Sequence, residues 1–229
     1  MHTTLRPRLN SRRYGLHIAA VFALGLAPST RIAAQNAIDL RSAATSWTVF
    51  NRSASVLDSG GRTILRLTDK PNGGMIWNPS LRMQDGEINV DVRGRDVFQK
   101  SFLGVAFHVA SGDSLDVVWL RPFNFRAADS ARHAHAVQYA AYPNASWEKL
   151  RADHPGAFEA AFPGNGDPDA WHHLRLILRG EDLTVYIDGA ATPVLHVQTK
   201  GGRTTGGIGL WVGDQSPGDF ANLTVQPLR

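Results

Sequence analysis

Hydrophobic and polar side chains alternate with a period of two over long stretches of this chain. In residues 86–93 the aliphatic side chains occupy every second position, and the positions between them are charged or polar. Residues 173–179 and 183–188 follow the same pattern. Strict alternation is typical of β-strands that bury one face in a core and leave the other in water. The sequence therefore predicts a protein built mainly of half-buried strands.

Clusters of turn-forming residues separate these runs. Gly, Pro, Asn, Asp and Ser gather at 58–62, 70–74, 110–114, 179–182 and 200–207. This spacing predicts about a dozen short strands in an antiparallel sandwich. One short helix is expected within residues 144–151, with Asn144 or Ser146 as its cap. The predicted fold class is all-β, because the pattern lacks the helices that would connect the strands of a parallel sheet.

The first 34 residues have the order of a secretory signal peptide. A basic leader is followed by an apolar run from about Leu16 to Ala27 and by small residues before Gln35. The run is too short to span a bilayer, and Pro28 and Arg31 follow it closely, which disfavours a membrane anchor. "SRRYGL" at 11–16 resembles the twin-arginine export motif, although Gly15 departs from it and leaves the ordinary export route open. We expect residues 35–229 to be one exported domain, periplasmic or extracellular in a bacterium.

Removal of the leader changes the charge of the chain. Residues 1–34 hold five of the 24 basic residues and no acid, which leaves 19 basic against 20 acidic residues. A chain close to neutral lacks the basic face that binding of nucleic acid requires. The sequence contains no cysteine, which excludes disulfides and thiolate metal sites. No later segment is long and apolar enough to cross a membrane, and the sequence leaves the oligomeric state open.

Several motifs resemble one known superfamily. They include "F-x-G-V-A-F" at 102–107, "VVWLRPFNFR" at 117–126 and "WHHLRLILRGEDLTVYIDG" at 171–189. Over roughly residues 40–227 the chain resembles the concanavalin A-like lectin/glucanase superfamily, and within it exported laminin-G-like and 3-keto-disaccharide hydrolase-type domains. The resemblance implies a jelly-roll β-sandwich, a glycan or glycoside as partner and, in some members, a structural Ca²⁺ ion; no other cofactor is expected. Members include enzymes and pure binders, so the fold does not decide activity.

The acid motif of one enzyme group in that superfamily is missing. Family 16 glycoside hydrolases carry E-x-D-x-x-E on one strand, and no segment here matches it. The nearest candidates, Glu87 and Asp91, have no third acid. Since glycoside hydrolysis ordinarily needs paired carboxylates, this mechanism is disfavoured unless distant strands bring acids together.

Residues 117–126 change from a buried strand to a mixture of arginine and aromatic side chains. Pro122 cannot donate to a ladder, so we expect a bulge or a sheet edge here. A bulge would bring Arg121, Asn124 and Arg126, beside Trp119, to the mouth of a groove. Guanidinium groups suit a carboxylate or a sugar diol. The alternative is an internal tie of Arg121 or Arg126 to one of three acids, Asp116, Asp129 or Glu159.

Other candidates for ligand binding come from two further segments. In residues 207–213 Trp211 points away from an aliphatic row, and an exposed Trp on the concave face of a curved sheet can stack on a sugar ring. Burial of Trp211 under a loop is the alternative. The long connection 143–159 carries Trp147 and Arg151, and Gln138 lies close before it. Glu159 would be the acid of an enzyme, or else a buried partner of Arg151.

Two groups of residues are candidate metal ligands. His133 and His135, two apart on an expected strand, would share a face as H-x-H ligands do, but a third ligand is missing and a solvated strand edge is the alternative. His172 and His173 are interpreted as structural. Asp219 is a candidate calcium ligand, and so is the turn at 164–171 with its Asp167 and Asp169, although such a turn forms without an ion.

Three hypotheses for function remain open from the sequence. The first is a secreted lectin-like protein that holds a glycan on the concave face of the sandwich. The second is an enzyme that acts on a glycoside or a 3-keto disaccharide, with Glu159 or Asp116 acting together with His133 or His135 as acid and base. The third is an interaction protein of the cell envelope without a small ligand. Binding is slightly favoured over catalysis.

Overall fold

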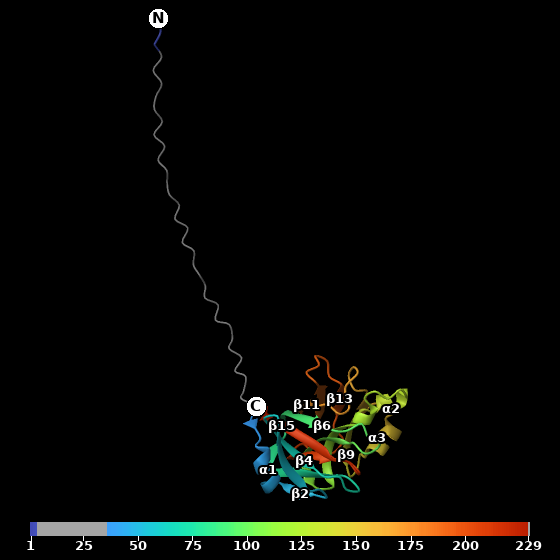
Figure 1. Ribbon diagram of the computed structural model, residues 1–229. Helices are drawn as coiled ribbons and strands as arrows, with labels where there is room; N and C mark the ends of the chain where they lie inside the picture. The colour runs from blue at the N-terminus through green and yellow to red at the C-terminus, as the bar shows by residue number, and fades with distance from the viewer. Residues whose placement is uncertain (4–35, 229) are drawn as a thin grey trace. The chain divides into compact units, whose positions relative to one another are not determined.

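A computed structural model describes residues 1–3 and 36–228, which form fifteen strands in two sheets (Figure 1). The proposed signal peptide falls almost entirely outside these residues and stays a prediction. One sheet has eight strands, in the order β13 (Leu195–Gln198), β12 (Asp182–Ile187), β11 (His172–Arg179), β6 (Gly86–Arg93), β15 (Gly218–Pro227), β4 (Arg62–Leu67) and β3 (Ala54–Ser59), with β1 (Asn36–Ala37) also pairing with β15. The other has seven strands, in the order β10 (Glu159–Ala160), β9 (Val137–Tyr142), β8 (Ser114–Leu120), β7 (Leu103–Ser111), β14 (Gly206–Val212), β5 (Gly74–Met83) and β2 (Thr48–Phe50).

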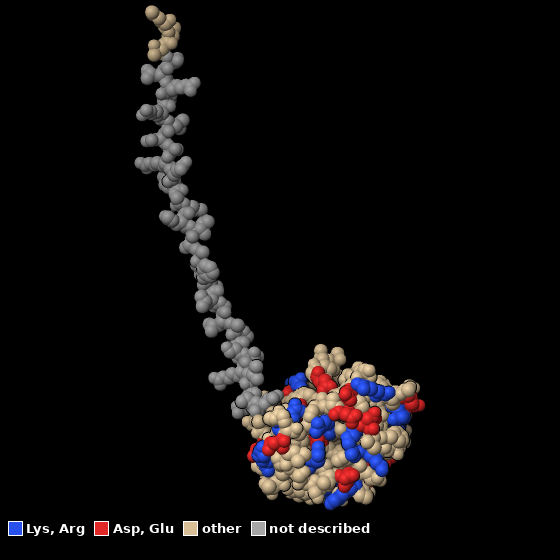
Figure 2. Space-filling model, in the orientation of Figure 1, with Lys and Arg blue, Asp and Glu red and all other residues tan. Residues whose placement is uncertain are grey.

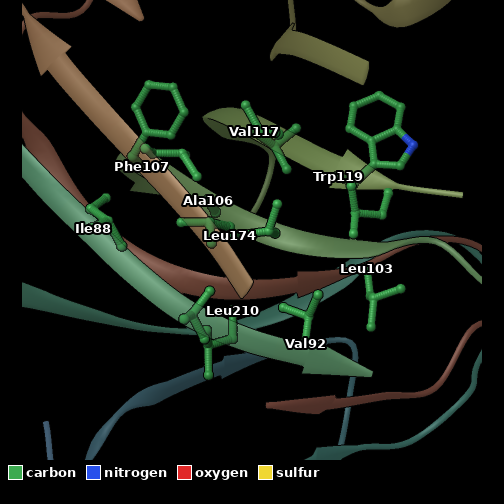
Figure 3. Packing of buried hydrophobic residues seen from close by; sticks show 14 of the residues in the cluster. Ile88, Val92, Leu103, Ala106, Phe107, Val117, Trp119, Leu174 and Leu210 are labelled. Atoms are coloured by element: carbon green, nitrogen blue, oxygen red, sulfur yellow. The ribbon is translucent and has the colours of Figure 1, made fainter. Parts of the chain in front are cut away.

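The period-two pattern places the core between the sheets, and every pairing is antiparallel, as predicted. The aliphatic side chains of β6, β11 and β12 are buried at alternate positions. Ile88 and Val92 of β6 belong to one buried cluster with Leu103 and Leu210 of the seven-stranded sheet (Figure 3). Each buried aliphatic side chain of this size contributes about 1.5–3 kcal/mol. The predicted all-β sandwich is confirmed.

The helical content exceeds the single helix that was predicted. The expected one is α3 (Trp147–Asp153), and Ser146 caps it by accepting a hydrogen bond from the Lys149 amide. The structure adds α1 (Leu40–Ser46), α2 (Ser130–Ala134) and the 3₁₀ turn η1 (Pro122–Asn124). Helices α2 and α3 lie at the same end of the sandwich (Figure 1). No helix among the described residues is long and apolar enough to cross a membrane.

The outer face of the eight-stranded sheet is covered by paired charges. Asp219 of β15 lies between Arg66 and Arg93, its register partners on the two neighbouring strands, and accepts hydrogen bonds of 2.6–2.8 Å from both. His173 bonds to Asp91 at 2.8 Å, and the buried His172 bonds to Asp188 at 2.8 Å, so both rings are held within the fold, while their structural role stays a prediction. Acidic and basic side chains are intermixed on the face shown in Figure 2. Opposite charges therefore compensate one another here.

Candidate functional site

One row of side chains crosses the whole seven-stranded sheet. Strand register aligns one residue from each strand, in the order Glu159, Gln138, Trp119, Gly104, Trp211, Met75 and Phe50. Alternation along each strand puts this row on the face opposite to Val118 and Leu210, which point to the core between the sheets. The row brings together four of the residues predicted from the sequence to belong to a site: Trp119, Gln138, Glu159 and Trp211.

Gly104 gives the row its shape. It separates Trp119 from Trp211, and a Cβ at this position would collide with the backbone of Val118 and Trp119. Without a side chain between them, the two indole rings approach to 5.3 Å between centroids, tilted by 41°. Trp119 is almost fully buried and Trp211 is partly exposed. The pair therefore forms an aromatic floor in which the ring of Trp211 is the accessible one.

A cavity of about 490 Å³ lies over this floor. Its aromatic lining consists of Phe98, Phe102, Trp119, Phe123, Tyr142, Trp147 and Trp211. Its polar lining consists of Gln99, Arg121, Asn124, Arg132, His135, Arg151 and Asp214. A second hollow, of about 410 Å³, shares Gly73, Tyr142 and Trp211 with the first, so the two adjoin at these residues. Both volumes fall in the range of about 300–1,000 Å³ that is usual for small-molecule sites.

Arg121 enters the cavity because strand β8 ends at Leu120. Pro122 starts the 3₁₀ turn η1, where a strand bulge was predicted, and Arg121 stands at its N-terminal cap. The Arg121 guanidinium donates to the His135 carbonyl at 2.7 Å and to Gln138 Oε1 at 3.2 and 3.3 Å. No carboxylate of residues 36–228 lies within 4.0 Å of it. The predicted tie of Arg121 to Asp116, Asp129 or Glu159 is therefore wrong, and its partners are neutral.

The position of Arg121 is electrostatically unfavourable. The residue is 6% exposed. Burial, together with repulsion from Arg151, lowers the pKa of Arg121 to about 10, although Glu159 opposes the shift. Its guanidinium carbon lies 5.2 Å from the ring centre of Trp119, 5.7 Å from that of Trp147 and 5.8 Å from that of Phe102. Aromatic faces stabilise a cation in such a place, but they do not neutralise it.

Glu159 is held by two partners beside the cavity. Arg151 donates from Nε to Oε1 at 2.9 Å and from Nη2 to Oε2 at 2.6 Å. His135 Nε2 lies 3.3 Å from Oε1. Burial, with the positive charges of Arg151 and Arg121, lowers the pKa of His135 despite Glu159. The salt bridge to Arg151 is confirmed, and both oxygens of this carboxylate are engaged.

Some predicted site residues lie elsewhere. Arg126 is exposed and does not line the cavity, and among the described residues it donates to the Asn165 carbonyl alone, at 3.4 Å, because the turn η1 lies between Arg121 and Arg126. His133 lies in helix α2 rather than on a strand, so it does not share a strand face with His135 and does not line the cavity.

Asp116 lies on the opposite face of β8 from Trp119. It accepts hydrogen bonds from Tyr139 at 2.5 Å and from Arg203 at 2.8 Å. Burial and the negative charge of Asp116 raise the pKa of Tyr139. The predicted acid–base partnership of Asp116 with His133 or His135 is therefore wrong, because the sheet itself separates Asp116 from the cavity.

Asp219 is not placed as a metal ligand. Both of its oxygens accept from guanidinium groups. Asp169, at the other proposed calcium site, accepts from the Asp96 amide at 3.0 Å, and Asp167 accepts from the Asp169 amide at 3.1 Å. In the part of the chain that the structure describes, no cluster of three or more His, Cys, Asp or Glu residues could hold a metal ion.

Sequence reasoning missed several residues of the lining. Tyr142 is four positions after Gln138 on β9 and so shares its face, a relationship that strand alternation could have revealed. Arg132 reaches the cavity from α2 and stacks on Phe98 at 4.6 Å, and Asp214 follows strand β14. Arg132 and Asp214 lie outside strands, and no pattern in the sequence indicates their positions.

Comparisons with known proteins are informative at the level of structure. Neither a comparison with protein-family models nor one with curated proteins gives a match. Among solved structures, the chain is similar to the carbohydrate binding module CBM66 from Bacillus subtilis, with a TM-score of 0.54 and 17% identity over 79% of this chain and 94% of the other.

It is also similar to the exoplasmic/lumenal domain of VIP36 in its Ca²⁺/Man3GlcNAc-bound form, with a TM-score of 0.51 and 14% identity over 80% of this chain and 85% of the other. A Bacillus subtilis protein of unknown function with a galectin-like fold gives a TM-score of 0.51 and 15% identity, over 80% and 90% of the two chains. The fold is a concanavalin A-like β-sandwich. This confirms the resemblance found in the sequence at the level of the fold, the level that such low identities establish.

Proposed function

We propose that this chain is an exported carbohydrate-binding protein that holds a glycan in the cavity over the seven-stranded sheet, on its concave face. The observation that carries the proposal is the composition of this cavity: tryptophan rings from three separate elements line it together with a buried arginine. The C–H bonds of a pyranose ring pack on aromatic faces, and planar forked donors suit pairs of sugar hydroxyls. Arg121, Asn124 and Arg151 supply such donors beside Trp119, Trp147 and Trp211.

The shape of the site supports a ligand of more than one sugar ring. The main cavity and the second hollow share Trp211 and Tyr142, so a ring stacked on Trp211 would have open space on both sides. Two structurally similar proteins support the class of ligand, since one is named a carbohydrate binding module and the other was solved with Man3GlcNAc. We therefore propose an oligosaccharide that runs along the sheet.

Binding accounts for this site better than hydrolysis does. Among the described residues that line the cavity, the carboxylate is that of Asp214, while Glu159 beside it is committed to Arg151. A pair of carboxylates facing one substrate, as ordinary glycosidases require, is not assembled here. An envelope protein without a small ligand would not account for the aromatic cavity.

The proposal requires export but no cofactor. Export rests on the signal-like order of residues 1–34. A structural Ca²⁺ ion is left out of the proposal because guanidinium donors occupy both oxygens of Asp219. Expression of the full chain in a bacterium, followed by mass spectrometry of the exported product, tests export: a new N-terminus near Gln35 is expected, and an uncleaved cytoplasmic product would contradict it.

A glycan array followed by calorimetry tests binding. We expect saturable binding of at least one oligosaccharide without release of sugar, and a loss of at least tenfold in affinity for Trp211→Ala. Trp171→Ala is the matched control, because Trp171 stacks under Arg62 and Arg93 away from this cavity. Absence of binding to any glycan would overturn the function. Equal effects of the two variants would overturn the location, and release of sugar would favour the hydrolase.

A further inference from the structure

Two arginines of this protein, Arg66 and Arg151, each hold a carboxylate through the Nε–Nη2 edge of the guanidinium group. Arg66 holds Asp219 through Nε and Nη2, at 2.6 and 2.8 Å. Arg151 holds Glu159 through the same two nitrogens. This edge offers two parallel N–H donors spaced to match the two oxygens of a carboxylate.

In Arg121 the corresponding edge has no acceptor. Its Nη1 donates to the His135 carbonyl, and Nη1 and Nη2 together hold Gln138 Oε1. The Nε–H and the second N–H of Nη2 find no acceptor among residues 36–228, although the residue lines the cavity. The bonds to Gln138 and His135 fix the guanidinium plane, so the free edge is already oriented.

No carboxylate among residues 36–228 forms an ion pair with Arg121. Arg132, which lines the same cavity, donates to the Phe123 carbonyl at 3.0 Å and to Asn124 Oδ1 at 3.3 Å, both neutral groups. Arg151 is neutralised by Glu159, and Asp214 accepts from the Asn72 amide at 2.6 Å. Burial without a contacting anion, together with repulsion from Arg151, accounts for the lowered pKa of Arg121.

We infer that the glycan bound in this cavity is acidic, and that the free Nε–Nη2 edge of Arg121 binds a carboxylate of the sugar. The inference rests on the proposed function and adds the chemical class of the ligand. An incoming carboxylate would neutralise Arg121 inside a wall of three aromatic rings, where charge-assisted hydrogen bonds are stronger than in water. A neutral sugar would leave the buried charge uncompensated.

Matched pairs of ligands test this on the unaltered protein. Trigalacturonate is titrated against its methyl ester, and an array presents further uronic and sialic acid glycans beside their carboxyl-reduced forms. The exported wild-type protein should bind at least one acid tenfold or more tightly than its neutral partner. If neutral glycans bind and no acid is preferred, this inference fails while the proposed function stands. If no glycan binds, the proposed function fails, and the inference fails with it.

Two variants locate the carboxylate. Arg121→Lys keeps the charge but removes the fork, so affinity for the acid should fall at least tenfold, and by a larger factor than affinity for the neutral partner, and the preference for the acid should be lost. Arg126→Lys, five residues away and outside the cavity, should leave both affinities unchanged. Retained preference for the acid in folded Arg121→Lys would overturn the assignment. If Arg121→Lys does not fold, the wild-type comparison still decides whether the ligand is acidic.

Discussion

Arg151 of helix α3 and Glu159 of strand β10 close the loop between them with a two-pronged ion pair, and the Arg151 guanidinium stacks on Trp147 at 4.7 Å. The Glu159 side chain is 3% exposed, while that of Arg151 is 32% exposed. The pair therefore ties the helix that carries Trp147 to the edge of the sheet. Removal of the acid should loosen this tie and leave a charge without its partner.

We predict that Glu159→Gln lowers the free energy of unfolding by about 2 kcal/mol, because one partner of a largely buried pair is lost. Urea unfolding measures this. The matched control is Asp153→Asn, which breaks the exposed pair of Lys149 and Asp153 on the same helix and should leave the midpoint unchanged. Equal midpoints for Glu159→Gln and the wild type would contradict the structural role of Glu159.

Substitutions of the two adjoining tryptophans, Trp119 and Trp211, should separate effects on stability from effects on binding. Trp119→Ala removes a side chain that is 2% exposed and should destabilise the protein by about 3–5 kcal/mol. Trp211→Ala removes the accessible ring and should lower stability much less while weakening glycan binding. Thermal unfolding and calorimetry of both variants measure the contrast. A larger loss of stability in Trp211→Ala than in Trp119→Ala would contradict the finding that Trp119 is the more deeply buried ring.

Stability should depend on pH through His173. Its hydrogen bond to Asp91 raises the pKa of His173, against the effect of burial. A raised folded-state pKa stabilises the protein below the unfolded value near 6.5, and this contribution is lost as the pH rises through the folded-state pKa. His135, whose pKa is lowered, acts in the opposite direction and weakens the protein as the pH falls below its unfolded value.

The contribution of His173 is therefore measured as a difference. The gap in unfolding free energy between the wild type and His173→Gln should be largest at about pH 5.5 and should shrink toward pH 9. Denaturant titrations across this range provide the measurement. A gap that is constant or grows with pH would show that the His173–Asp91 pair does not form.

Asp219 should act through its two arginines rather than through an ion. Burial pushes the pKa of Asp219 upward, but hydrogen bonds from Arg66 and Arg93 outweigh burial and hold the pKa below its usual range. A lowered carboxyl pKa stabilises the protein above the unfolded value near 4, and this stability is lost as the pH falls. Asp219→Asn should therefore lower stability by about 1 kcal/mol at pH 7, since the arginines are partly in water, and the deficit should shrink toward pH 3.

Calcium provides the discriminating measurement for Asp219. EDTA or added CaCl₂ should leave the melting temperature of the wild type unchanged within error. An increase in melting temperature with calcium that disappears in Asp219→Asn would overturn the ion-pair interpretation and restore Asp219 as a metal ligand.

The sequence predicted the architecture because each strand carries its own periodicity. The alternation in β6, β11 and β12 predicts which face of each strand is buried without reference to the partner strand. The capping residue Ser146 likewise predicts a helix from local sequence alone. The same alternation could have excluded Asp116, which is three positions from Trp119 and so faces the other side of β8.

The other incorrect predictions concern segments that lack a hydrophobic periodicity. Pro122 was known to end a ladder, but whether the chain bulges or turns into a 3₁₀ helix depends on its packing, and the turn sends Arg126 away from Arg121. His133 and His135 were placed on a strand, although Asp129, the cap of α2, accepts a hydrogen bond from the Arg132 amide and starts a helix before them. The cavity of Arg121 could not be predicted, because its wall comes from connections whose paths the sequence does not specify.

The cross-strand row from Glu159 to Phe50 has a practical consequence for engineering. Its residues come from seven different strands, whereas the cover above them comes from the segments 94–102, 121–136 and 143–158. These two parts of the molecule can be varied separately. A library that randomises only the covering segments would retain the indole platform, so the sandwich offers a scaffold onto which new ligand preferences could be grafted.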